Sequence, residues 1–132
     1  MATGNLVTTN GKKLAFNRIF KGTPDYLAPV CFKVGTGTTT PTVADTDLDT
    51  AIQIAGVDTK DFVVGYPSLD ESTLNATIRG ILLTTECNGN SITEFGTFNK
   101  DGTPLMFSRS VFTTVTKTAT VQVIFVEKDV VI

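Results

Sequence analysis

Residues 92–109 read ITEFGTFNKDGTPLMFSR, and this stretch decides the fold. Two runs rich in apolar, Thr and Ser residues flank the polar segment Asn99-Lys100-Asp101-Gly102. Turns favour Asn, Asp and Gly, whereas strands favour aromatic and β-branched residues. The stretch therefore predicts a β-hairpin with one acid on its first arm, Glu94, and one base on its second arm, Arg109.

The composition of the whole chain indicates the same class of structure. Its 132 residues suit one domain, and 24 of them are threonine, a β-branched residue at home in a half-buried strand. Only 18% of the residues are charged, below the usual value of about 25%. A weakly charged polar surface can be covered by a neighbouring protein without stranding many ions.

One helix is predicted near the N-terminus, over residues 12–20. Asn10 can cap its start, and Gly22 and Pro24 stop it. Its apolar residues recur at the i, i+3, i+4 spacing of a helix: Ala15, Phe16, Ile19 and Phe20. A strand is the alternative for this stretch, but the stop signals favour the helix.

Strands are predicted wherever alternating or short apolar runs are bounded by turn residues. They cover residues 27–35, 51–55, 61–65, 73–87, 92–98, 105–112 and 118–127. A loop is expected over residues 67–72, and Asn88-Gly89 predicts a hairpin between the strands at 73–87 and 92–98. The pattern indicates a mainly β chain, an antiparallel β-sandwich or barrel-like sheet, forming a single domain over residues 1–132 with one short N-terminal helix.

Both ends of the chain are predicted to reach outward. Residues 1–9 are small and polar and are expected to form an extended N-terminal arm. Residues 128–132 are the predicted C-terminal docking tail, in which Val130, Val131 and Ile132 are the candidate assembly contacts. The alternative is that this tail closes the protein's own sheet.

Several classes of function lack the residues that they need. The sequence contains no histidine, which removes Ser/His/Asp and Cys/His catalysis and the commonest metal ligand. The net charge is −2 without a basic cluster, so no nucleic-acid partner is expected, and no apolar run approaches the roughly 18 residues of a membrane span. The start lacks the features of a secretory signal, so synthesis in a cytoplasm is expected. We expect no enzymatic activity, no cofactor and no small-molecule substrate.

Two short motifs match ligand-binding loops only in part. Gly35 and Gly37 lie in a glycine-rich segment after a predicted strand, but the Gly-Lys-Ser/Thr of a phosphate loop is missing. Asp45, Asp47 and Asp49 have the spacing of a calcium loop, whose sixth and twelfth residues are here Thr and Gly instead of Gly and Glu. The expected roles are a tight loop at a strand end and a capping or solvated acidic segment.

Cys31 and Cys87 are expected to be two small buried thiols. Neither belongs to a C-x-x-C pair, so no metal centre is predicted. A disulfide between them would need an oxidising compartment and adjacent strands, and the sequence indicates neither.

Glu94 and Arg109 are the sharpest candidates for a defined contact. If residues 98 and 105 close the turn as a pair, Glu94 and Arg109 lie directly opposite each other, whereas a shift of two residues puts Glu94 opposite Phe107. A cross-strand ion pair would set the register and stabilise an exposed hairpin by about 0.2–1 kcal/mol. No matching acid or base marks Glu94 as catalytic, so a structural role is expected.

Two segments, taken in order, resemble one family of phage virion proteins. The first, FKVGTGTTTPT at residues 32–42 followed by DTDL at 45–48, resembles the G-x-G-x-x-x-P…D-x-x-L segment of phage tail-collar fibre proteins. The second, ITEFGTF at residues 92–98 followed by Asp101-Gly102 and Leu105, resembles that family's E-x-G-L-F-x-x-D-G-x-L hairpin. Threonine stands at position 97, where the family usually has leucine. The likeness covers about residues 10–126.

The resemblance implies a non-enzymatic structural protein of a phage virion, assembled in the host cytoplasm through contacts with other virion proteins and with itself. In the family this module attaches a long fibre to the baseplate, so a small tail collar, baseplate or fibre-attachment component is expected. A head decoration protein that covers capsid joints is the alternative. A receptor- or glycan-binding module is a further alternative, although two tyrosines and no tryptophan offer few aromatics for it.

Overall fold

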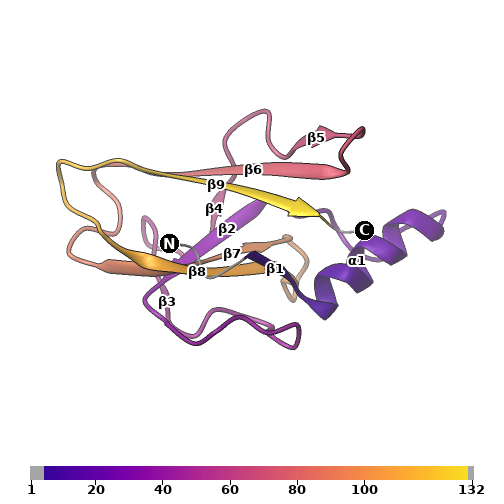
Figure 1. Cartoon of the computed structure of the whole chain (residues 1–132), viewed down its shortest axis with the longest axis horizontal. Helices are drawn as coiled ribbons and strands as arrows, with labels where there is room; N and C mark the ends of the chain where they lie inside the picture. The colour runs from indigo at the N-terminus through magenta and orange to yellow at the C-terminus, as the bar shows by residue number, and fades with distance from the viewer. Residues whose placement is uncertain (1–4, 131–132) are drawn as a thin grey trace.

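The computed structural model describes residues 5–130, which form two antiparallel β-sheets and one helix (Figure 1). The two sheets lie one above the other, and α1 (Thr9–Phe20) projects from one end of the pair. The predicted mainly β class with one short helix is therefore confirmed.

The larger sheet has six strands in the order β1-β8-β7-β2-β3, with β4 also paired to β2. Its strands are β1 (Asn5–Val7), β2 (Cys31–Gly35), β3 (Ala51–Ile52), β4 (Lys60–Asp61), β7 (Ser91–Phe98) and β8 (Met106–Thr116). The smaller sheet has the order β5-β6-β9. Its strands are β5 (Ser68–Asp70), β6 (Asn75–Leu82) and β9 (Val123–Val130). The predicted hairpin of residues 92–109 is confirmed as β7 and β8.

Aromatic rings from both sheets meet between the layers. Phe125 of β9 stacks on Phe95 of β7 with ring centroids 5.0 Å apart, and Phe95 stacks on Phe32 of β2 at 5.3 Å. Gly80 of β6 leaves the space that Phe32 fills, because a Cβ at Gly80 would lie 2.7 Å from that ring. Burying a phenylalanine side chain stabilises a fold by roughly 1.5–3 kcal/mol, so this cluster holds the two sheets together.

The predicted helix is confirmed, but it begins at Thr9 and its N-cap is Thr8 instead of Asn10. Thr8 is fully buried and accepts a hydrogen bond from the Gly11 amide (3.0 Å). Its hydroxyl donates to the carbonyl of Met106 in β8 (2.8 Å). The start of the helix is therefore fixed by a contact with a distant strand, which a local capping signal does not contain.

The apolar stripe that predicted α1 does not face the protein interior. The buried residues of the helix are Gly11 and Leu14, and Leu14 packs with Val7 and Phe107. The side chains of the stripe remain largely in solvent, at 65%, 59% and 74% exposed for Phe16, Ile19 and Phe20.

The hairpin predicted at Asn88-Gly89 is wrong. The strand predicted over residues 73–87 ends at Leu82, and β6 pairs with β5 and β9 instead of β7. Gly89 does take a left-handed conformation, with φ of 85°, but the turn carries the chain from the smaller sheet to the larger one. An Asn-Gly turn signal fixes a reversal of the chain and leaves open which sheet the next strand joins.

Both predicted terminal arms belong to the sheets where the structure describes them. Residues 5–7 form β1, which pairs with β8, so a free arm is wrong for this part; residues 1–4 lie outside the described range. β9 continues to Val130, which pairs with Asn75 of β6. The tail therefore closes its own sheet as far as Val130, as the alternative expectation had it. Val131 and Ile132 lie outside the described residues.

The short strands at the sheet edges also differ from the predicted ranges. The strands predicted at 51–55 and 61–65 are reduced to the two-residue strands β3 and β4, and the loop predicted at 67–72 contains β5. These short strands form at sheet edges, where pairing with β2 or β6 decides the conformation more than local propensity does.

Candidate functional site

Three consecutive residues of β8 organise the polar interior of the molecule. Side chains of a strand alternate between the two faces of its sheet. Arg109 points to the outer face, where the segment of residues 36–50 covers it, and Ser108 and Ser110 point to the inner face, where β9 covers them. Both faces carry a buried carboxylate from a neighbouring element, Glu94 outside and Glu127 inside.

Glu94 accepts five hydrogen bonds although its side chain is fully buried. Backbone amides of the covering segment donate three of them, from Gly37 (2.8 Å), Asp49 (3.0 Å) and Thr50 (2.9 Å). Arg109 donates the other two, from Nε (3.2 Å) and Nη2 (3.1 Å), to the Oε1 oxygen. A buried carboxylate is stable only with such complete pairing, so Glu94 ties the segment of residues 36–50 to the sheet.

Arg109 is 1% exposed and binds two further acids of the same segment. Its Nη1 lies 2.9 Å from Oδ2 of Asp45, and its Nη2 lies 3.1 Å from Oδ2 of Asp49. We call Glu94, Arg109, Asp45 and Asp49, together with the three amides, the Glu94 clamp. The guanidinium fork suits this arrangement because it presents donors in several fixed directions.

The ionisation of the clamp follows from these contacts. Burial opposes the charge of Asp45, but hydrogen bonds from Thr42 and Arg109 outweigh it and lower the pKa of Asp45. A hydrogen bond from Thr39 is the main cause of the lowered pKa of Asp49, with Arg109 adding to it. Burial alone would lower the pKa of Arg109, but its bonds to Asp45 and Glu94 raise it instead. Asp45, Asp49 and Arg109 therefore stay charged at neutral pH.

The ion pair between Glu94 and Arg109 forms, but neither predicted register is correct. Glu94 lies opposite Val111 and Arg109 lies opposite Gly96, so the two charged residues are diagonal neighbours. Two differences near the turn produce this offset: Phe98 pairs with Met106 instead of Leu105, and the register shifts by one residue between Thr97 and Phe98. A bulge adds a residue to one strand only, which counting along a hairpin cannot anticipate. The ion pair is also buried. The stabilisation of about 0.2–1 kcal/mol expected from the sequence applies to an exposed pair.

Gly35 and Gly37 serve the clamp through their lack of a side chain. A Cβ at either position would lie 2.5 Å from Oε2 of Glu94. Neither glycine has a positive φ, so the tight turn expected from the sequence does not require glycine at these positions. Glycine is required because the carboxylate of Glu94 approaches the backbone closely. On the other strand Gly96 gives the same kind of space to Leu48, whose Cδ2 would lie 2.9 Å from a Cβ at position 96.

The turn of the hairpin is organised by Asn99, which is 1% exposed. Its Oδ1 accepts a hydrogen bond from the amide of Leu105 (2.8 Å), and its Nδ2 donates to Oδ2 of Asp101 (2.8 Å). Asp101 also accepts a hydrogen bond from the amide of Leu27 (3.2 Å), which joins the turn to the segment after α1. Asp101 is confirmed as a turn residue; Gly102 lies in the same turn with open space around it.

The inner face carries a second acidic cluster that the sequence analysis missed. Ser108 and Ser110 donate hydrogen bonds to the two carboxyl oxygens of Glu127, at 2.7 Å and 2.9 Å. Asp129 is 1% exposed and hydrogen-bonds to Glu127. Burial is the main cause that raises the pKa of Glu127 to about 8, and the charge of Asp129 adds to it. We call Glu127 and Asp129, with the two serines, the Glu127 pair.

Strand alternation was the signal that could have found this pair. Val123 and Phe125 alternate with Ile124 and Val126 in the sequence, and continuing the same period of two puts Glu127 and Asp129 on the face of Val123 and Phe125. The predicted strand ended at Glu127 and residues 128–132 were assigned to a docking tail, so Asp129 was not placed on the same strand face as Glu127.

The chemistry available to these groups is limited. Among residues 5–130 no group of three or more His, Cys, Asp or Glu could hold a metal ion. The clamp carboxylates are occupied by Arg109 and by amides, and Asp47 of the D-x-D-x-D motif binds Lys33 at 3.0 Å. Cys31 and Cys87 are free and buried, as predicted, and burial raises the pKa of both thiols. The arrangement fits the fixing of a covering segment to a sheet.

The chain was compared with known proteins, and its helix was examined as a candidate membrane span. No helix in the described part of the chain has the length and apolar character needed to cross a membrane. No protein-family model, curated protein or solved structure matches the chain.

Proposed function

We propose that this chain is a non-enzymatic structural protein of a phage virion, a small tail collar, baseplate or fibre-attachment component that acts through protein–protein contacts. The observation that carries the proposal is the Glu94 clamp. It joins in space the two segments of the sequence that resemble phage tail-collar fibre proteins.

The contacts between these two segments involve the motif residues themselves. Glu94 of the hairpin binds the amide of Gly37 and approaches Gly35 so closely that neither position has room for a side chain. Leu48 of the first segment packs over Gly96 of the second. A chance likeness in two separate stretches gives no reason for their residues to meet, whereas a shared module does.

The experiment is to locate the chain in purified particles. Virions of the phage that encodes it are separated into heads and tails, and its peptides are quantified by mass spectrometry against a known tail protein. About six to eighteen copies in the tail fraction, as the rotational symmetry of a tail implies, are expected. Copies on the order of hundreds in the head fraction would favour capsid decoration instead, since symmetric shells repeat their subunits many times. Absence from both fractions would refute a virion role.

A further inference from the structure

The end of the molecule from which α1 projects carries five large apolar side chains that are strongly exposed. Phe16, Ile19 and Phe20 lie on α1, and Leu69 and Leu74 lie on or next to β5 and the start of β6. Their exposed fractions run from 56% to 74%. Figure 1 shows α1 and the β5–β6 turn at this same end, one on each side of it. We call this region the helix end.

An apolar groove opens between the two sheets at the helix end. It has a volume of about 360 Å³, and all of its lining side chains are apolar, among them Pro29, Leu69, Ile78 and Phe107. A smaller hollow of about 210 Å³ adjoins it through Leu69 and extends it to Leu74. Phe107 also packs against Leu14 of α1, so the groove and the base of the helix are neighbours.

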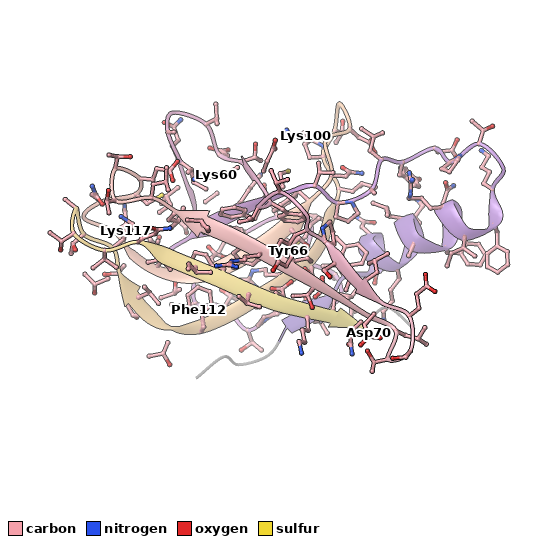
Figure 2. The ribbon with its side chains drawn as sticks, turned by 90° about the horizontal axis from the view of Figure 1, so that it is seen from above. Lys60, Tyr66, Asp70, Lys100, Phe112 and Lys117 are labelled. Carbon is pink, nitrogen blue, oxygen red and sulfur yellow. The ribbon has the colours of Figure 1, made fainter. Side chains whose placement is uncertain are left out.

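The charges of the helix and of the groove rim are complementary. α1 carries Lys12, Lys13 and Arg18 and no acidic residue. The rim of the smaller hollow carries Asp70 and Glu71, both exposed. Asp70 lies toward the helix end in Figure 2, whereas Lys117 lies toward the opposite end. A helix with exposed apolar side chains and basic residues beside them thus lies next to an apolar groove with an acidic rim.

Leu74 gives an independent indication that this surface is kept for contact. It has a φ of 58°, in the left-handed region that leucine rarely adopts, and it is 56% exposed. Glycine or asparagine would fit such a turn with less strain. A leucine there does little for the isolated fold, but it extends the apolar surface next to the groove.

We infer that the helix end is a self-association surface, in which α1 of one copy places Phe16 and Phe20 in the apolar groove of a second copy. Because helix and groove adjoin each other, two copies related by a two-fold axis exchange helices reciprocally, and each Lys12 and Lys13 approaches the other copy's Glu71. The inference deepens the proposed function by naming a partner for one surface, and it is tested on the purified protein alone.

The test measures self-association by sedimentation velocity over a concentration series. The chain is expected to form a dimer whose dissociation constant rises at least tenfold in Phe16→Ser/Phe20→Ser and in Leu74→Asn. Val57→Ser removes an equally exposed apolar side chain outside the helix end and is the matched control, with no expected change. Because all four residues are exposed, each variant should keep its circular dichroism spectrum, and Leu74→Asn should melt no lower than the parent protein.

A charge exchange tests the direction of the contact. Lys12→Glu/Lys13→Glu and Glu71→Lys should each weaken the dimer, and mixing the two variants should restore association between them. A protein that stays monomeric at every concentration, or a dimer that the helix and groove variants leave unchanged, would overturn the inference. Neither result would bear on the proposed virion role, which depends on the location of the chain in the particle.

Discussion

The Glu94 clamp and the Glu127 pair lie on opposite faces of β8, and they show how differently two buried carboxylates behave. Glu94 and Glu127 are 0% and 7% exposed, so burial is nearly the same. Glu94 meets a guanidinium and three amides, all of which favour a negative charge. Glu127 meets two hydroxyl groups and a second carboxyl group, and its pKa is raised to about 8.

The contrast teaches that partners, more than depth, decide the charge of a buried acid. At neutral pH the clamp holds a segment by ionic bonds, whereas the inner pair keeps a proton on Glu127 and bridges the two sheets by hydrogen bonds. Four variants separate these two behaviours, from the largest expected effect to the smallest.

Replacing Arg109 with Leu should have the largest effect. The change leaves Glu94, Asp45 and Asp49 close together without their cation, and breaking a buried ion pair from one side costs about 3–5 kcal/mol. Urea unfolding measures the loss, with Arg18→Leu as the control because Arg18 is exposed. A loss below about 1 kcal/mol, the value for a surface ion pair, would show that the clamp is not stabilising.

Glu127→Gln should act in the opposite direction and stabilise the protein at neutral pH. The folded protein keeps a proton on Glu127 up to pH of about 8, while the unfolded chain releases it near 4.5. The stability contributed by this group is therefore complete below pH 4.5 and is lost as the pH rises to about 8. A neutral amide removes this loss, a gain of at most about 3 kcal/mol at pH 7.

Thermal melts from pH 4 to pH 9 measure this effect, and Glu71→Gln, which changes an exposed glutamate, is the control. The slope of stability against pH should flatten in Glu127→Gln alone. An unchanged slope would mean that Glu127 is charged in the folded protein, and the contrast between the two clusters would fail.

Glu94→Gln should destabilise the protein by about 2 kcal/mol, because hydrogen bonds to a charged acceptor are lost and the amide NH₂ faces other donors. Hydrogen exchange adds a local measurement: the amides of Gly37 and Thr50 should lose protection. Protection that persists at both amides would show that other contacts hold the covering segment.

Gly37→Ala should have the smallest effect, a loss of about 1–2 kcal/mol, because its Cβ would press on Glu94 and the segment must shift. Gly22→Ala is the matched control, since a Cβ there meets nothing within 4 Å. Chemical denaturation compares the two variants. Equal denaturation midpoints would indicate that the segment of residues 36–50 shifts without loss of stability.

The hairpin and the strands were predictable because their signals are local. Phe32 and Val34 alternate with Cys31 and Lys33 in β2 as the sequence indicates, and both phenylalanines of β7 are buried. The partners of the strands were not predictable in the same way. The Asn88-Gly89 turn suggested that β6 pairs with β7, yet β6 pairs with β9, more than forty residues along the chain.

The residues of the candidate site show the same difference between local signals, which were predictable, and contacts between distant segments, which were not. The pairing of Glu94 with Arg109 was predicted from a single hairpin, but its register was missed because Met106, not Leu105, closes the turn opposite Phe98 and a bulge follows next to Thr97. Asp45 and Asp49 were seen only as an acidic motif, since nothing in their own segment shows that Arg109 lies beneath them.

The sequence by itself determined the β class, the hairpin of residues 92–109 and the presence of α1, because periodicity and turn chemistry act over a few residues. Only the tertiary structure decided which charges are buried together and which face of α1 remains open. Groups from distant parts of the chain decide whether a buried carboxylate stabilises or destabilises the fold. Glu94 and Glu127 are the same residue type in similar strands, and the two faces of β8 give them different partners.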